Sequence, residues 1–177
     1  PNRPDALGIY GIARDLSASG AGKLRIIEIP DVEGIFKPHL NISLDEEVSS
    51  KECPLFVGRY LRSVQNRESP QWLKNRLINV GLNPISALVD ITNYLTFDRA
   101  RPLHVFDADK LSGGLTVRRS VEGEKFHALD DKIYELNEGM IVITDEKEIV
   151  SLGGIIGGMK SAVSDDTKNV LLEAAYF

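Results

Sequence analysis

The chain has 177 residues, of which 42% are hydrophobic and 27% charged, and its formal net charge is −5. A chain of this size and composition can bury a hydrophobic core without disulfide bonds or structural metals. Its single cysteine, Cys53, excludes an internal disulfide. The acidic balance argues against tight independent binding to RNA, because phosphate contacts supply most of that affinity. No apolar run is long enough to span a membrane, so we expect no membrane association and a cytoplasmic location.

The N-terminal third contains one clear helical pattern. Apolar residues recur at helical spacing over residues 5–19, and "SASGAG" ends the pattern. The run "LRIIEI" that follows predicts a short strand. We interpret residues 30–53, which carry scattered prolines and mixed polarity, as a connector with at most one short strand.

Residues 55–98 are predicted to form one strand and two helices. The run "LFVGRYLRSV" is rich in apolar and aromatic residues and indicates the strand. "SPQWLKNRLINVG" indicates a helix in which Ser69 is the cap, Pro70 lies in the first turn and Gly81 closes the end.

The second helix is predicted over "NPISALVDITNYLTFD". Its apolar face is expected to consist of Ile85, Leu88, Ile91, Thr92 and Leu95. Thr92 and the adjacent asparagine are poor helix formers in its middle. They have either a structural role, in which the threonine bonds back to the preceding turn, or a role toward a ligand.

The pattern changes after residue 113. Short β-like runs separated by polar or glycine turns follow one another: "LTVRRS", "KFHALD", "KIYELN", "MIVITD", "EIVSLGG" and "NVLLEAAYF". Helices therefore dominate the first part and strands the second. This order predicts an α+β fold with a largely antiparallel sheet region.

The glycine-rich stretch "LGGIIGGMK" does not fit a nucleotide phosphate loop. Gly153 and Gly158 have the required spacing, but Met159 stands where that loop needs a lysine. Two interpretations stay open. The glycines either form tight turns between strands, or they clear side chains away so that a ligand lies against bare backbone.

Two titratable residues stand in apolar surroundings. His104 in "RPLHVFDADK" is either a proton-transfer group or a satisfied core histidine. Glu173 is expected on a strand face between Leu171 and Ala175, where a carboxylate needs a partner, either an arginine or a donor from a ligand. The three histidines and Cys53 lack the spacing of metal ligands, so we expect no metal site.

Five segments together resemble one family, the β subunits of bacterial phenylalanyl-tRNA synthetases. The segments are "NRPDALGIYGIARDL", "ALVDITNYLTF", "RPLHVFDADKL", "LGGIIGG" and "SDDTKNVLLEAAYF". The resemblance implies that residues 1–46 are the tail of a preceding module plus a connector. It implies that residues 47–177 are an editing module, truncated at its C-terminal end.

The function implied by the resemblance is hydrolysis of tyrosine wrongly esterified to tRNA(Phe). In that family Glu173 corresponds to the glutamate that accepts the tyrosine hydroxyl. His104 corresponds to a pocket histidine near the ester, which positions or deprotonates the attacking water. The implied partners are the acceptor end of mischarged tRNA(Phe) and the catalytic α subunit of the parent heterotetramer.

Four further residues match family positions at the pocket. Thr92 and Asn93 match residues that line it, and Gly154 and Gly157 match glycines that keep it open and offer backbone amides. The resemblance implies no cofactor in this segment, and ATP and Mg²⁺ in the parent enzyme. Two alternatives stay open: a non-catalytic scaffolding or tRNA-docking module, and a free-standing aminoacyl-tRNA deacylase.

Overall fold

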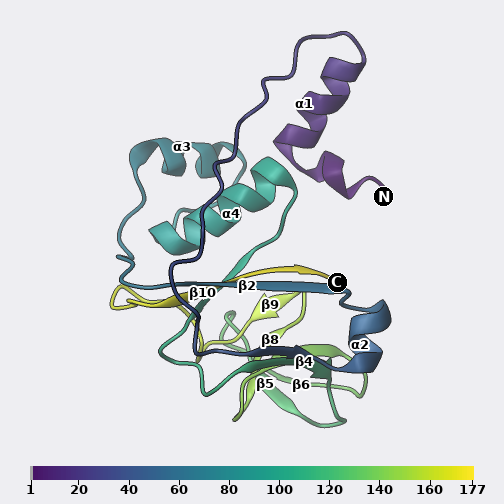
Figure 1. Cartoon of the computed structure of the whole chain (residues 1–177), viewed down its shortest axis with the longest axis vertical. Helices are drawn as coiled ribbons and strands as arrows, with labels where there is room; N and C mark the ends of the chain where they lie inside the picture. The colour runs from purple at the N-terminus through teal and green to yellow at the C-terminus, as the bar shows by residue number, and fades with distance from the viewer. Residues whose placement is uncertain (1) are drawn as a thin grey trace.

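The computed structural model describes residues 2–177 and shows the predicted α+β fold (Figure 1). The helices are η1 (Pro4–Leu7), α1 (Ile9–Ala18), α2 (Glu46–Lys51), α3 (Gln71–Asn79) and α4 (Ala87–Arg99). The strands are β1 (Ile42–Leu44), β2 (Leu55–Leu61), β3 (His104–Asp107), β4 (Leu115–Arg119), β5 (Lys125–His127), β6 (Ile133–Glu135), β7 (Ile141–Thr144), β8 (Ile149–Leu152), β9 (Ile156–Gly157) and β10 (Val170–Tyr176).

The strands form two main sheets and a small hairpin. One sheet has the order β2-β10-β3 and is antiparallel throughout. The other has the order β1-β4-β7-β8-β9, in which only the β1–β4 pair is parallel. Strands β5 and β6 pair with each other. The largely antiparallel sheet region predicted from the sequence is therefore confirmed.

The molecule is layered. Figure 1 shows α3 and α4 on one side of the three-stranded sheet, and the five-stranded sheet on its other side. The main core lies between the two sheets, where Tyr60, Phe106 and Leu171 from the first pack with Val117 and Ile143 from the second. This layering gives the three-stranded sheet one face toward helices and one face toward β strands.

The N-terminal helical region lies apart from the sheets and is joined to them by a long extended connector (Figure 1). The predicted helix over residues 5–19 is interrupted at Gly8, which has an extended backbone. A Cβ on this glycine would lie 3.0 Å from that of Ala100, at the end of α4. The lack of a side chain at Gly8 therefore lets the start of α1 lie close to the end of α4.

The strand predicted for "LRIIEI" is wrong. Residues 24–29 have no regular structure, and the exposed fractions of Ile26 and Ile29 are 78% and 79%. A β-branched run becomes a strand only where a neighbouring strand and a packing surface receive it. This segment meets neither condition within residues 2–177, because none of the described sheets includes it.

Two details of the predicted helices are also wrong. Ser69 does not cap α3, whose N-cap position is Pro70; its hydroxyl instead donates to Oδ2 of Asp90 at 2.6 Å. In α4 the buried residues are Asp90 and Thr92, whereas Ile85, just before the helix, and Ile91 are exposed. Asp90 faces inward because the Ser69 hydroxyl and the backbone N–H of Ile85 satisfy its carboxylate.

Candidate functional site

Glu173 and His104 lie directly opposite each other on neighbouring antiparallel strands. Glu173 of β10 is in register with His104 of β3 on one side and with Gly58 of β2 on the other. Residues that are directly opposite in an antiparallel pair project from the same face of the sheet. That face is directed toward the five-stranded sheet, because the backbone of Gly157 in β9 lies against the His104 ring.

Glu173 has the apolar setting expected from its sequence neighbours. Its exposed fraction is 6%, and Leu171 and Ala175 on the same strand face belong to the core or pack against it. Its Oε2 atom is buried and has no hydrogen-bond partner, and no arginine within residues 2–177 forms an ion pair with it. Burial raises the pKa of Glu173 to about 7. The carboxyl group therefore has one buried oxygen, Oε2, that the protein leaves without a hydrogen-bond partner.

His104 is the second polar group of this pair. Its Nε2 atom is buried without a hydrogen-bond partner, and its ring packs edge-on against Phe106 with 4.4 Å between centroids. Burial lowers the pKa of His104 to about 4. The imidazole is consequently neutral near pH 7, and one ring nitrogen is free to accept a hydrogen bond.

The two predicted glycines have different surroundings. A Cβ on Gly157 would lie 2.7 Å from Nε2 of His104 and closer still to Cε1, so the histidine ring requires a glycine here. Gly154 lies in the turn between β8 and β9 with φ +69°, and its nearest side chain is the ring of Phe177. The turn interpretation thus fits Gly154, and the bare-backbone interpretation fits Gly157.

Thr92 and Asn93 lie on α4, on the helical side of the three-stranded sheet (Figure 1). The Thr92 hydroxyl donates to the backbone oxygen of Val89 at 2.7 Å, which confirms the structural alternative of bonding back to the preceding turn. Among residues 2–177 no hydrogen bond joins either side chain to Glu173 or His104. The structure thus brings together Glu173, His104 and Gly157.

Sequence reasoning missed Gly58 and the surroundings of Cys53. Gly58 is opposite Glu173 on β2, where a Cβ would meet side-chain atoms of Ile42 and Leu171. A glycine inside a strand pattern is the signal that marks such a close approach. Cys53 is fully buried, and burial together with the charge of Glu173 raises the pKa of its thiol.

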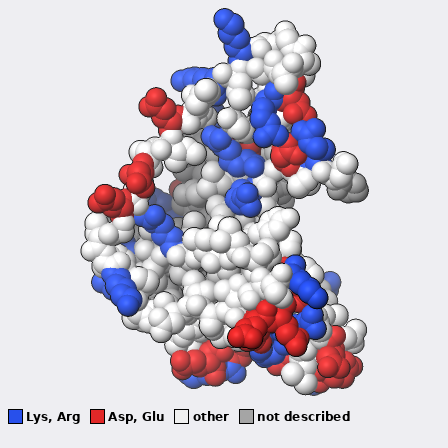
Figure 2. Space-filling model, turned by 45° about the vertical axis from the view of Figure 1, so that its right-hand side comes forward, with Lys and Arg blue, Asp and Glu red and all other residues white. Residues whose placement is uncertain are grey.

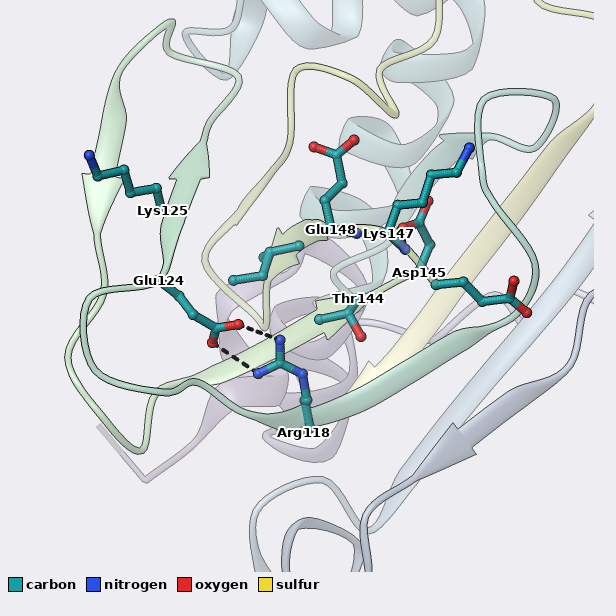
Figure 3. A pocket seen from close by; sticks show the side chains of 9 residues that line it. Arg118, Glu124, Lys125, Thr144, Asp145, Lys147 and Glu148 are labelled. Carbon is teal, nitrogen blue, oxygen red and sulfur yellow. Dashed lines mark hydrogen bonds and ion pairs between the residues drawn. The ribbon is translucent and has the colours of Figure 1, made fainter.

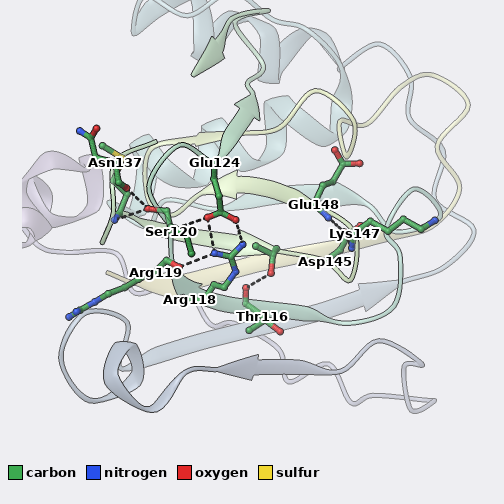
Figure 4. A network of polar contacts seen from close by, with 12 residues as sticks. Thr116, Arg118, Arg119, Ser120, Glu124, Asn137, Asp145, Lys147 and Glu148 are labelled. Atoms are coloured by element: carbon green, nitrogen blue, oxygen red, sulfur yellow. Dashed lines mark hydrogen bonds and ion pairs between the residues drawn. The ribbon is translucent and has the colours of Figure 1, made fainter. Parts of the chain in front are cut away.

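A polar cleft of about 350 Å³ lies elsewhere, on the five-stranded sheet (Figure 3). Arg118 donates two hydrogen bonds to Glu124, at 2.9 and 2.6 Å, across this cleft. The Asp145 carboxylate accepts backbone N–H groups from Ser112, Lys147 and Glu148 (Figure 4). The hollow is therefore lined by groups whose central charges already compensate one another.

Three arginine side chains on the surface each have an acidic partner. Arg118 pairs with Glu124, Arg119 with Glu52, and Arg99 with Asp98. Figure 2 shows basic and acidic side chains interspersed over one face of the molecule.

Residues 2–177 contain neither a metal-binding cluster nor a membrane-spanning helix. No three His, Cys, Asp or Glu side chains are grouped there so as to hold a metal ion. None of the helices in the same residues is both long enough and apolar enough to cross a membrane. Within the described part of the chain, only the buried pair Glu173–His104 combines polar atoms that lack partners with an enclosed setting.

Comparisons with known proteins point to one family. The B3/4 domain family matches residues 52–177. Phenylalanine–tRNA ligase β subunits from Ruegeria pomeroyi and Cereibacter sphaeroides are 51% and 48% identical to this chain over all its residues. The chain spans 22% of the length of each. The resemblance stated from the sequence motifs is thereby confirmed.

A solved structure supports the fold. It is an N-terminal fragment of the phenylalanyl-tRNA synthetase β subunit from Pyrococcus horikoshii. It has a TM-score of 0.60 and 19% identity, and the similarity covers 98% of this chain and 52% of that one. At this identity the match bears on the architecture alone.

Proposed function

Because the chain belongs to the B3/4 domain family, and matches a segment of phenylalanine–tRNA ligase β subunits, we propose that it carries an editing site. The proposed reaction is hydrolysis of tyrosine wrongly esterified to tRNA(Phe). The observation that supports it best is the buried carboxyl group of Glu173, whose Oε2 atom has no donor. A tyrosine side chain brings a hydroxyl donor on an aromatic ring, and an apolar setting suits that ring.

The energetic case rests on what phenylalanine lacks. A phenol that donates to Glu173 satisfies a buried acceptor, whereas a phenyl ring leaves it without a partner. An unsatisfied buried polar group costs about 1–3 kcal/mol, and more when it is charged. A hydrophobic synthetic pocket rejects an added hydroxyl by only about a hundredfold. A second pocket that requires the hydroxyl supplies the discrimination that the first one lacks.

His104 is proposed to position the attacking water. In its neutral form the buried Nε2 accepts a hydrogen bond from a water molecule, directing the water oxygen at the ester carbonyl. The bond from the acyl carbon to the ribose oxygen breaks as the new C–O bond forms. One proton of the water goes to the ribose oxygen, and free tyrosine and deacylated tRNA result.

The remaining implications concern the full-length protein. We propose that its substrate is the acceptor end of tRNA(Phe), that it assembles with a catalytic α subunit, and that it works in the cytoplasm. ATP and Mg²⁺ would be used by the synthetic reaction elsewhere in the assembly. Within this chain we propose the division into residues 1–46 and 47–177, and pocket-lining roles for Thr92, Asn93 and Gly154.

The decisive experiment replaces Glu173 in the full-length protein. Glu173→Ala is expected to lower the ratio of tyrosyl- to phenylalanyl-tRNA hydrolysis by about ten- to a hundredfold, since about 1.4 kcal/mol corresponds to a factor of ten. Glu173→Gln keeps the side-chain volume and one acceptor oxygen. Its ratio of hydrolysis rates should therefore lie between those of wild type and Glu173→Ala.

Glu124→Ala is the matched control, because it removes the glutamate that is hydrogen-bonded to Arg118 in the polar cleft, which we call the paired cleft. It should leave the ratio of hydrolysis rates unchanged. An equal ratio in wild type and Glu173→Ala would contradict the proposal. That result would favour the alternative of a non-catalytic scaffolding module.

A further inference from the structure

A second buried polar cluster lies at the far end of the strands that carry the Glu173–His104 pair. We define it as the Asp107 knot, made of Asp107, Ser161 and Thr167, whose exposed fractions are 4%, 2% and 2%. The Thr167 hydroxyl donates to Oδ2 of Asp107 at 2.6 Å. The backbone N–H of Asp107 donates to the backbone oxygen of Ser161 at 2.9 Å. The contacts of the knot are therefore satisfied within the protein.

The knot joins the three segments that build the candidate site. Asp107 ends β3, the strand that begins with His104. Ser161 follows β9, which ends at Gly157, and Thr167 precedes β10, which carries Glu173. All three backbone segments around the pair are thus tied together at one place.

The ladder between β3 and β10 is short, which makes its end contacts decisive. It contains four residue pairs, from Val170–Asp107 at the knot to Glu173–His104 at the site. Strand β3 is at the edge of its sheet and pairs with β10 alone. A slip by one residue would turn the His104 side chain to the opposite face of the sheet. The knot therefore adds polar contacts at the end of a ladder whose middle is held by the buried pair Phe106–Leu171.

The bonds within the knot fix position along the strand direction. Thr167 is itself held, because its hydroxyl accepts the backbone N–H of Ser164 at 2.8 Å. The backbone N–H of Ala108 donates to the oxygen of Asn169 at 2.9 Å, next to the knot. Asp107 also accepts the N–H of Asp109 and lies 3.6 Å from Nζ of Lys110.

We propose that Asp107 and Thr167 are positioning residues for the editing site, because their buried hydrogen bond sets the register that makes His104 face Glu173. The inference rests on the proposed function for its consequence in catalysis. It adds two residues that touch neither the substrate nor the reacting atoms.

The test compares three variants of the full-length protein. Thr167→Val removes the hydroxyl at nearly constant volume and is expected to slow tyrosyl-tRNA hydrolysis by about ten- to a hundredfold, as small misplacements of a site do. Thr167→Ser keeps the hydroxyl and should stay within about threefold of wild type. Thr144→Val is the matched control, since it removes another buried threonine hydroxyl, on β7 of the other sheet.

A second measurement is independent of activity. Histidine NMR titration, with the signal assigned by His104→Gln, should show the pKa of His104 near 4 in wild type, Thr167→Ser and Thr144→Val. In Thr167→Val the pKa should move toward about 6.5, because the displaced ring meets water. Asp107→Asn keeps the shape of the side chain and should give an intermediate value if Thr167→Val does not fold.

The outcomes separate the two proposals. If the His104 pKa moves only when the knot is broken but wild type does not hydrolyse tyrosyl-tRNA, positioning stands and the proposed function fails. If wild type hydrolyses tyrosyl-tRNA while Thr167→Val changes neither the rate nor the His104 pKa, the positioning role is overturned. An equal change in Thr144→Val overturns it as well.

Discussion

Glu173 and Glu124 are two glutamates of one chain in opposite chemical surroundings. Glu124 lies in an open cleft, where Arg118 donates two hydrogen bonds to it and lowers its pKa. Glu173 lies between two sheets with a buried oxygen that has no donor, and burial raises its pKa to about 7. The protein thus supplies hydrogen-bond donors to the carboxylate of Glu124 but none to the Oε2 atom of Glu173.

The contrast teaches that a hollow with charged walls is weaker evidence of a site than a buried group without a partner. Native proteins satisfy the great majority of their buried polar atoms, so an exception asks for an explanation. The cleft around Arg118 has volume and charge, but its central groups are already paired. The Glu173–His104 pair has two such exceptions on adjacent strands.

The largest expected effect concerns the pH dependence of the free energy of unfolding. Between about pH 4.5 and 6.5 the unfolded chain carries a proton on His104 and none on Glu173. The folded chain does the reverse, because burial lowers the pKa of His104 to about 4 and raises that of Glu173 to about 7. Both states hold one proton on the pair, so its contribution to the slope cancels in wild type.

Single variants should expose the two opposing slopes. His104→Gln leaves only the raised pKa of Glu173, so stability should fall by about 3 kcal/mol as pH rises from about 4.5 to 7. Glu173→Gln leaves only the lowered pKa of His104, so stability should rise by about 3 kcal/mol from about pH 4 to 6.5. Urea unfolding at several pH values measures both.

The control for these slopes is the double variant His104→Gln with Glu173→Gln, from which both titrating groups are absent, as their contributions cancel in wild type. Its stability curve should run parallel to that of wild type. Parallel curves for all three variants would mean that neither buried group has a shifted pKa. The contrast between Glu173 and Glu124 would then lose its electrostatic basis.

The next effect in size concerns the space around the pair. Gly157→Ala places a methyl group against the His104 ring, which is enclosed by Phe106 and β9. Overpacking of this kind costs about 1–3 kcal/mol, and displacement of the ring should slow tyrosyl-tRNA hydrolysis as well. Thermal unfolding and a deacylation assay measure the two losses.

Gly34→Ala provides the comparison for this substitution, because a Cβ there meets nothing within 4 Å. It should change the free energy of unfolding by less than about 0.5 kcal/mol. Wild-type hydrolysis in Gly157→Ala would show that the position of the His104 ring is unimportant for the reaction.

Much of the fold could be predicted from periodicity. The strands after residue 113 and the helices α3 and α4 have patterns long enough to be identified locally. The strand predicted at residues 24–29 failed because its partner would have to come from elsewhere in the fold. The apolar face predicted for α4 was right for Thr92 and wrong for Ile85 and Ile91. The inward position of Asp90 was missed because it depends on Ser69, a contact between distant residues.

The candidate site was only partly accessible to sequence reasoning. The apolar neighbours of Glu173 could be read from a strand of alternating pattern, and the structure confirms them. Its position opposite His104 depends on pairing between β10 and β3, whose four-residue length gives no local signal. The knot at Asp107 is invisible for the same reason, since it joins residues 60 positions apart.

The smallest expected effect comes from the paired cleft. Arg118→Gln breaks two hydrogen bonds to Glu124 between side chains that are 27% exposed, and should cost about 0.5–1 kcal/mol at pH 7. Because Arg118 lowers the pKa of Glu124, this contribution is present above about pH 4.3 and is lost as pH falls through the lowered value. Urea unfolding at pH 7 and at pH 3 should show the difference shrinking.

Arg118→Gln should leave the hydrolysis of tyrosyl- and phenylalanyl-tRNA as it is in wild type. The cleft and the buried pair belong to different sheets, and Glu124 keeps the backbone N–H of Val121 as a donor at 2.7 Å. A changed ratio of the two rates would connect the paired cleft to the site. A carboxylate that already has its hydrogen-bond donors could then still belong to the site. The distinction drawn between Glu124 and Glu173 would have to be abandoned.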